Sequence, residues 1–198
     1  PGRRLVNMSE IKNVLFVGVG GQGAILASKI LTIGLIESGY DVKMSEVHGM
    51  SQRGGSVSTQ VRFGPKVYSP IIGPGTADLL VSFEEMEAAR YLKFLKPEGK
   101  VVVNTLQIPS MPVLSGKRKY PQTVLEELKA RTTVLPLNAT QIATDIGNPK
   151  SANVVLLGAL IKALDLTDID WKSIISRTVK PKFVDINLKA FDAGMAAV

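Results

Sequence analysis

Hydrophobic residues occur first as a short unbroken run, Asn-Val-Leu-Phe-Val at 13–17, that ends at a glycine. A run of this kind is typical of a strand buried on both faces of a sheet. The next stretch, 22–38, is apolar around most of a helical circumference and stops before Gly39. We therefore predict a helix that is covered on more than one side. With a second strand at 42–47, the order strand, glycine turn, helix, strand indicates a doubly wound α/β domain.

The pattern changes after the second strand, where apolar and polar side chains alternate over 56–63. Alternation with a period of two is typical of a half-buried strand. Gly64 and Pro65 are typical turn residues, and a short apolar segment at 66–68 follows them. We therefore predict a two-stranded antiparallel hairpin, 56–63 with 66–68, inserted into the sheet.

The α/β pattern then resumes and continues to the end of the chain. Further strands are expected at 79–83, 100–104 and 133–137. Further helices are expected at 84–96, 121–131, 138–146, 151–165, about 171–177 after the capping residue Asp170, and from about 182. Residues 105–120 contain prolines and show no clear period, so we predict a long loop of the functional, interfacial or mobile kind.

These elements predict an α/β fold: a doubly wound, mostly parallel sheet in a Rossmann-like three-layer α/β/α arrangement, with the inserted antiparallel hairpin. The 198 residues fit a single domain, 1–198, that is large enough to bury a core. Residues 1–12 precede the first strand and are expected to form a loosely ordered N-terminal segment. No apolar run reaches the roughly 18 residues of a membrane-spanning helix, so we expect a soluble, cytoplasmic protein without a membrane partner.

Composition restricts the chemistry that this chain can perform alone. It has one histidine and no cysteine. The lack of cysteine excludes disulfides, thiolate nucleophiles, iron–sulfur clusters and cysteine-ligated zinc, and one histidine cannot build a histidine-rich metal centre. We therefore predict no metal site here. Any redox chemistry must use a bound organic cofactor or another chain.

The chain is basic, with 24 Lys and Arg against 17 Asp and Glu and a formal net charge of +7. A basic surface attracts nucleic acid, anionic cofactors or acidic proteins. The densest cluster is Lys117-Arg118-Lys119, and no aromatic residues are interleaved with it as on a platform for single-stranded nucleic acid. We therefore expect no nucleic acid partner and interpret the cluster as a solvated loop.

A glycine-rich turn at 18–23, Gly-Val-Gly-Gly-Gln-Gly, matches G-x-G-x-x-G between a predicted strand and a predicted helix. Glycine suits a tight turn that must let a phosphate approach the backbone closely. The helix that follows offers unpaired N–H groups and a partial positive charge. The sequence predicts an anion or phosphate site, with a purely structural turn as the alternative. The candidate cofactor-binding residues of this turn are Gly18, Gly20, Gly21, Gln22 and Gly23.

A second unusual segment is 47–56, Val-His-Gly-Met-Ser-Gln-Arg-Gly-Gly-Ser. Arg53 beside paired glycines could clamp a phosphate or a carboxylate, because its planar guanidinium donates two parallel hydrogen bonds. The alternative is a glycine-rich turn with Arg53 in a surface ion pair. The candidate cofactor-binding residues here are Ser51, Gln52, Arg53 and Gly54.

No catalytic residue is predicted. The chain has no tyrosine followed four positions later by lysine, no Gly-x-Ser-x-Gly elbow and no Gly-Asp-Gly signature of a thiamine diphosphate site. His48 has no orienting carboxylate placed by the sequence, and we expect it to be a packing or hydrogen-bonding residue. The pattern is that of a nucleotide-type fold without chemistry of its own.

Four segments together resemble the gamma-type subunit or domain of 2-oxoacid:ferredoxin oxidoreductases. They stand in family order at 18–23, 46–57, 151–160 and 187–194. The resemblance covers nearly the whole chain. The His-Gly-Met-Ser-Gln-Arg form of the second segment is most similar to the branch represented by the beta subunit of indolepyruvate ferredoxin oxidoreductases.

The resemblance implies a subunit of an enzyme that converts a 2-oxoacid and coenzyme A to acyl-CoA and CO2 while reducing ferredoxin. Indolepyruvate or another aryl pyruvate would be the 2-oxoacid. Thiamine diphosphate, Mg and 4Fe-4S clusters are expected on a large partner subunit, and contact with ferredoxin would be indirect. The chain would be inactive alone, would pack on that subunit in a hetero-oligomer and would help to bind coenzyme A. The coenzyme's diphosphate would suit Gly20–Gly23, and its 3′-phosphate would suit Arg53.

Two other functions remain as alternatives. A free-standing NAD(P)-binding Rossmann oxidoreductase is suggested by the glycine motif and by Glu46, an acidic residue near the end of the second predicted strand. An adenylating enzyme of the ubiquitin-activating type also uses a G-x-G-G-x-G turn, but the cysteines of that family are missing here.

Overall fold

A six-stranded sheet forms the centre of the computed structural model, which describes residues 10–48 and 54–198. The strands lie in the order β2-β3-β1-β4-β5-β6. Strands β1, β4, β5 and β6 pair in parallel, and β3 runs antiparallel to its neighbours β1 and β2. The strand bounds are β1 Lys12–Val19, β2 Asp41–His48, β3 Ser56–Gly64, β4 Ala77–Ser82, β5 Leu95–Asn104 and β6 Thr133–Leu137.

The antiparallel strand predicted at 56–63 is present as β3, but it does not pair with 66–68. β3 lies between β1 and β2 and pairs with both along its length. Both of its edges are therefore occupied, and 66–68 forms no strand. The N–H of Val67 instead donates to the carboxylate of Asp41 at 2.9 Å. The inserted antiparallel strand is confirmed, whereas its predicted hairpin partner is wrong.

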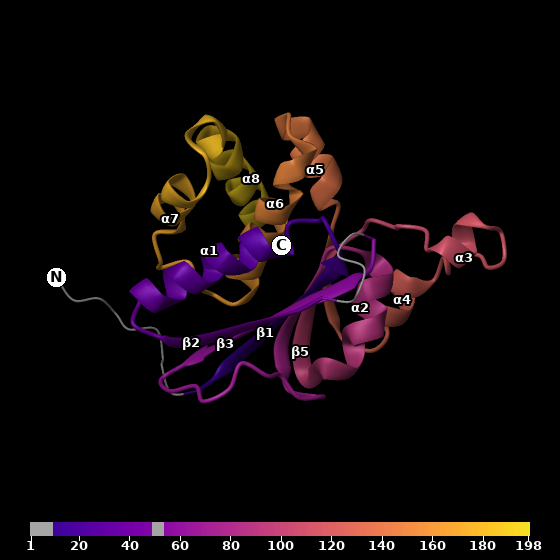
Figure 1. Cartoon of the computed structure of the whole chain (residues 1–198), viewed down its shortest axis with the longest axis horizontal. Coiled ribbons are helices and arrows are strands. Elements are labelled where there is room, and N and C mark those ends of the chain that lie inside the picture. The colour runs from indigo at the N-terminus through magenta and orange to yellow at the C-terminus, as the bar shows by residue number, and fades with distance from the viewer. Residues whose placement is uncertain (1–9, 49–53) are drawn as a thin grey trace.

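Helices cover both faces of the sheet, and alternate residues of β1 face the two layers. Val14 and Phe16 belong to the core on one face, and Leu15 and Val17 belong to the core on the other. The helices of the first face are α1 Ala24–Glu37, α5 Ala139–Ile146, α6 Ala152–Ala163, α7 Trp171–Thr178 and α8 Val184–Ala196. Those of the second face are α2 Glu85–Tyr91 and α4 Val124–Lys129 (Figure 1). The doubly wound three-layer fold is confirmed.

Some element bounds differ from the predictions. The helix predicted at 84–96 ends at Tyr91 and is followed by a 3-10 turn at Leu92–Phe94. β5 then begins at Leu95, which pairs with Ala77 of β4. Strand pairing therefore prevails over the helical pattern at this point. Two further 3-10 turns lie at Pro149–Ser151 and Pro181–Phe183.

Helices α6 and α8 pack at very short distance because both carry a glycine at their contact. A Cβ atom on Gly194 would lie 1.9 Å from the carbonyl oxygen of Val155, and one on Gly158 would lie 2.2 Å from the carbonyl oxygen of Phe191. No side chain fits at either position. The two glycines lie in the segments 151–160 and 187–194 of the sequence resemblance, and they permit the close approach of α6 and α8.

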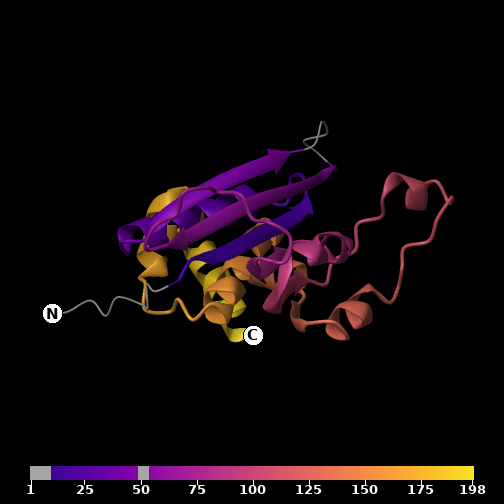
Figure 2. The same ribbon diagram turned by 90° about the horizontal axis from the view of Figure 1, so that it is seen from below.

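Residues 105–120, which we call the arm, leave the sheet after β5 and project from the body of the domain (Figures 1 and 2). The arm contains a single-turn helix, α3 Met111–Leu114, and returns to the body before α4. It is the long loop that the sequence predicts.

No helix in the described ranges is long and apolar enough to cross a membrane. For the predicted N-terminal segment 1–12, residues 1–9 lie outside the described residues, and β1 begins at Lys12. The assignment of 1–198 to a single domain stays a prediction.

Candidate functional site

The carboxyl ends of β1 and β4 meet at the point where the chain changes direction across the sheet. β1 leads through α1 toward β2, whereas β4 leads through α2 toward β5 on the other side. In open α/β sheets, ligands bind in the crevice at such a switch point. The glycine turn lies at this place.

At the start of α1, the glycine turn presents backbone N–H groups that have no acceptor within residues 10–48 and 54–198. Gly23 is the N-cap residue, has a φ of 85°, and brings no side-chain cap. Among the described residues, no acceptor pairs with the amides of Gly21, Gly23, Ala24 and Ile25. The first turn of α1 has no acidic residue. The positive end of the helix dipole is therefore available to an anion.

A cavity of about 460 Å³ adjoins these amides on the α1 face of the sheet. Its floor is formed by Val57 and Thr59 of β3, and Ile25 of α1 is on its wall. The remaining lining consists of Val19, Ala24 and the turn residues Gly20, Gly21, Gln22 and Gly23. The cavity thus brings backbone donors without an acceptor in the described residues next to the apolar side chains of Val57 and Ile25.

Gln22 ties the turn to the sheet through both ends of its side-chain amide. Its Oε1 accepts from the N–H of Val19 at 2.7 Å, and its Nε2 donates to the carbonyl of Phe83 at 3.0 Å. These bonds join the end of β1 to the end of β4. Gly18 is required beneath them, because a Cβ there would lie 2.8 Å from Oε1 of Gln22 and 2.9 Å from Cβ of Phe83. Gly18 and Gln22 therefore position the turn.

The two glycine segments of the sequence are brought together. The N–H of Gly20 donates to the carbonyl of Gly55 at 2.9 Å, and the N–H of Gly54 faces the carbonyl of Gly20 at 3.4 Å. Gly54, whose φ is 77°, thus lies beside the turn. The other candidates of that segment, Ser51, Gln52 and Arg53, lie outside the described residues.

Asn153 at the start of α6 is a positioning residue that the candidate set omits. Its Nδ2 donates to the carbonyl of Gly23 at 3.2 Å, and its Oδ1 accepts from the N–H of Val154 at 2.9 Å. A Cβ on Gly23 would lie 2.6 Å from that Nδ2. Asparagine at the start of an otherwise apolar helix is the sequence signal that could have identified it.

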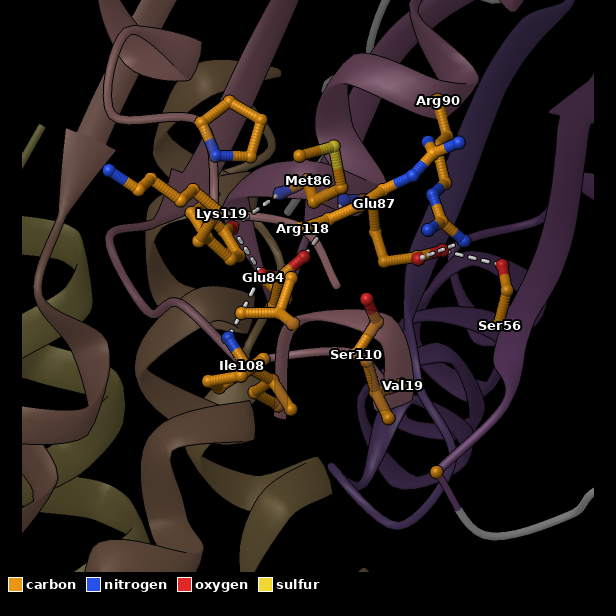
Figure 3. Close-up of a pocket in the computed structure, with 15 residues that line it drawn as sticks. Val19, Ser56, Glu84, Met86, Glu87, Arg90, Ile108, Ser110, Arg118 and Lys119 are labelled. Atoms are coloured by element: carbon orange, nitrogen blue, oxygen red, sulfur yellow. Dashed lines mark hydrogen bonds and ion pairs between the residues drawn. The ribbon is translucent and has the colours of Figure 1, made fainter. Parts of the chain in front are cut away.

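A second cavity of about 390 Å³ lies between α2 and the arm, and Val19 borders both cavities (Figure 3). Cations from two elements line it: Arg90 of α2, and Arg118 and Lys119 of the arm. In the described part of the chain, Arg118 and Lys119 form no ion pair, whereas Arg90 pairs with Glu87 at 3.3 Å. The sequence predicts only a solvated loop at Lys117-Arg118-Lys119, whereas the structure places Arg118 and Lys119 at this cavity.

One buried carboxylate, that of Glu84, joins α2 to both ends of the arm. Its Oε2 accepts from the N–H of Glu87 at 2.9 Å and caps α2. Its Oε1 accepts from the N–H of Ile108 at 3.1 Å and from the hydroxyl of Tyr120 at 2.5 Å. Burial and this bond to Glu84 raise the pKa of Tyr120 above its ordinary value, so the phenol stays a donor.

Glu87 links α2 to the start of β3. The carboxylate of Glu87 accepts a hydrogen bond from the hydroxyl of Ser56, which directly follows the Gly54-Gly55 pair. Figure 3 shows the Glu87 carboxylate between Ser56 and Arg90. Burial raises the pKa of Glu87, while Ser56 and Arg90 oppose the shift. The contact fixes the position where the second glycine segment enters the sheet.

The strand order argues against a dinucleotide site of the Rossmann type. In that fold β2 lies next to β1, so that an acidic residue at the end of β2 reaches the ribose. Here β3 separates them. Two strand spacings place β2 about 10 Å from β1. Glu46, near the end of β2, therefore does not lie beside the glycine turn.

Residues 13–197 match the family described as pyruvate ferredoxin/flavodoxin oxidoreductase. The indolepyruvate oxidoreductase subunit IorB of Pyrococcus horikoshii is 42% identical over 193 residues, which cover 93% of this chain and 95% of that protein. Pyruvate oxidoreductase subunit PORC from Thermotoga maritima has a similar fold, with a TM-score of 0.73 at 22% identity and coverage of 95% and 97%. The 2-oxoglutarate:ferredoxin oxidoreductase from Magnetococcus marinus, solved with 2-oxoglutarate, coenzyme A and succinyl-CoA bound, gives a TM-score of 0.71 at 21% identity, covering 96% of this chain and 31% of that one.

Proposed function

This chain belongs to the pyruvate ferredoxin/flavodoxin oxidoreductase family, and on that premise we propose that it is the coenzyme A-contacting subunit of an indolepyruvate-type 2-oxoacid:ferredoxin oxidoreductase. The complete enzyme would convert indolepyruvate or another aryl pyruvate, with coenzyme A, to acyl-CoA and CO2 and would pass the electrons to ferredoxin. Relatives named as indolepyruvate oxidoreductase subunits, at 38–42% identity, support this choice of substrate.

The observation that carries this proposal is a row of amides at the start of α1 that have no acceptor among the described residues and lie beside a cavity of about 460 Å³. Phosphate oxygens accept hydrogen bonds from such amides and are favoured by the helix dipole. At Gly21 a Cβ would meet no atom of the described residues within 4 Å, which supports a turn open to a ligand on that side. We assign the coenzyme A diphosphate to the amides of Gly21 and Gly23.

The remaining candidate residues take two roles in this proposal. Gly18, Gly20 and Gln22 hold the backbone of the turn in place through close packing and hydrogen bonds. Gly54 contacts the turn at Gly20, and Ser51, Gln52 and Arg53 directly precede it in the sequence. Arg53 would bind the 3′-phosphate of coenzyme A.

The redox cofactors would reside on a large partner subunit. The chain has no cysteine to ligate a cluster. Thiamine diphosphate with Mg would supply decarboxylation there, and 4Fe-4S clusters would carry the electrons to ferredoxin. In the Magnetococcus marinus protein the matched region is 31% of a longer chain, which supports a larger assembly. This chain's own residues would bind and orient coenzyme A at the interface.

The test is a calorimetric titration of coenzyme A into the assembled complex. Arg53→Ala should raise the Kd at least tenfold, which corresponds to about 1.4 kcal/mol. The matched control is Arg177→Ala, because Arg177 pairs with Glu37 at the far end of α1. An unchanged Kd in Arg53→Ala, or the same loss in both variants, would contradict the proposed site.

A further inference from the structure

The arm carries large apolar side chains that are exposed and are not part of the hydrophobic core. Met111 and Leu114 of α3 are 74% and 66% exposed. They are three residues apart on one helical turn, so they lie on the same side of it. Figures 1 and 2 both show α3 at the outer end of the arm, away from the sheet and its helices. Large apolar residues gathered at a projecting tip are typical of an interaction site.

Backbone hydrogen bonds within the arm hold the shape of its tip. The amides of Val113 and Leu114 both donate to the carbonyl of Ser110 at 2.9 Å, and the amide of Ser115 donates to Met111 at 2.9 Å. The amide of Arg118 then returns to the carbonyl of Pro112 at 3.0 Å. A tip that already holds its shape loses less conformational entropy on binding than a loose segment does.

Hydrogen bonds also fix the base of the arm to the rest of the domain. The backbone N–H of Thr105 donates to the carbonyl of Leu137 at 3.0 Å, and the backbone N–H of Glu85 donates to the carbonyl of Leu106 at 3.0 Å. The Glu84 carboxylate then accepts from Ile108 at one end and from Tyr120 at the other. The arm is therefore anchored at its base, where Thr105, Ile108 and Tyr120 are half-buried, while its tip projects with exposed side chains.

The charge of the arm selects the kind of partner. Residues 105–120 contain Lys117, Arg118 and Lys119 and no acidic residue. The whole chain has a formal net charge of +7, so a second copy would be repelled. An acidic partner would be attracted, and its association would be faster at low salt.

We propose that the arm docks the chain onto the large thiamine and iron–sulfur subunit, with Met111 and Leu114 inserted into an apolar socket that is rimmed by carboxylates. This inference rests on the proposed function, which supplies that partner. Arg118, Lys119 and Tyr120 of the arm also line the cavity of about 390 Å³. Docking at the tip therefore sets the position of one wall of that cavity.

The experiment uses the full chain and the large subunit copurified from the native host, separated and recombined on a biosensor surface. Met111→Ser combined with Leu114→Ser should raise the Kd for the large subunit at least tenfold, while thermal unfolding of the chain alone stays unchanged. Lys117→Glu should slow association several-fold at low salt and have little effect at high salt. Lys117 does not line the cavity, so this variant leaves the cavity intact.

The matched control is Tyr68→Ser, because Tyr68 is 88% exposed on the loop after β3 and lies outside the arm. Its Kd should equal that of the native chain. If the native chain binds and the double variant binds equally well, the arm proposal is overturned while the proposed function stands. An equal loss in Tyr68→Ser also overturns it. A native chain that binds no thiamine- and iron-containing subunit overturns both.

Discussion

The glycine turn and the arm follow strands at the same edge of the sheet, yet they are held in different ways. The turn is fixed by the side chains of Gln22 and Asn153 and by the backbone of Gly55. The arm is fixed at its base by Glu84, and the backbone amides of its tip donate hydrogen bonds only within the arm among the described residues. A turn whose amides must face a ligand needs an exact backbone. A projection that meets a protein needs a fixed base and a free tip.

Two glycines allow the sharpest test of this difference. Gly23 in the turn has a φ of 85°, and Gly116 in the arm has a φ of 73°. A Cβ on Gly23 would lie 2.6 Å from Asn153, whereas one on Gly116 would meet nothing within 4 Å. Gly116→Ala should cost about 1–2 kcal/mol in the free energy of unfolding, from backbone strain alone. Gly23→Ala should cost about 3 kcal/mol or more, because overpacking adds to the strain.

Urea denaturation of the isolated chain measures both values. Equal losses for Gly23→Ala and Gly116→Ala would show that the turn is no more tightly packed than the arm, contrary to the structure.

The second prediction concerns the contact that makes Gly23 special. Asn153→Ala should lower the free energy of unfolding by about 1–2 kcal/mol, because the carbonyl of Gly23 loses a donor. In the double variant with Gly23→Ala the two losses should not add, since Asn153→Ala removes the atom that a Cβ on residue 23 would strike. The expected coupling is about 1 kcal/mol in a double-mutant cycle. Strict additivity would argue that the two residues are not in contact.

The third prediction loosens the base of the arm. Tyr120→Phe removes the hydroxyl that donates to Glu84 and accepts from the amide of Met86 at 3.2 Å. The free energy of unfolding should fall by about 1 kcal/mol. Because the lost hydrogen bonds anchor the arm, trypsin should cleave the variant at Lys117, Arg118 or Lys119 faster than it cleaves the native chain. Tyr68→Phe is the control and should cleave at the native rate; unchanged cleavage of Tyr120→Phe would mean that the base is held by other contacts.

The smallest effect is a change in pH dependence. Burial raises the pKa of Glu87 above the 4.5 of an ordinary glutamate, so the native chain holds this proton more tightly than the unfolded chain does. The resulting stabilisation is present below pH 4.5 and is lost as the pH rises through the raised pKa. In Glu87→Gln the free energy of unfolding should therefore decline less over this pH range than it does in the native chain. Parallel pH profiles for the native chain and the variant would contradict the shift.

The sequence predicted most of the sheet and the place of the turn, because buried strands and G-x-G-x-x-G are local patterns. It could not predict that β3 would enter between β1 and β2, since pairing depends on which strand edges are available. Gln22 was predicted to bind the cofactor, and the structure adds that its amide bonds to the backbone of both β1 and β4. Asn153 and Glu84 were missed because each acts on residues far away in the chain. The cavity between α2 and the arm was missed for the same reason.

The central claim is that this chain completes a larger oxidoreductase and performs no chemistry alone. Purification from the native host, with identification of the companion chain and assays of its iron and thiamine diphosphate, tests this most directly. We predict a stable complex with a cysteine-rich large subunit that contains both, and no oxidoreductase activity from the isolated chain. A companion that lacks both iron and thiamine diphosphate, or an isolated chain that binds and reduces NAD(P), would contradict the account.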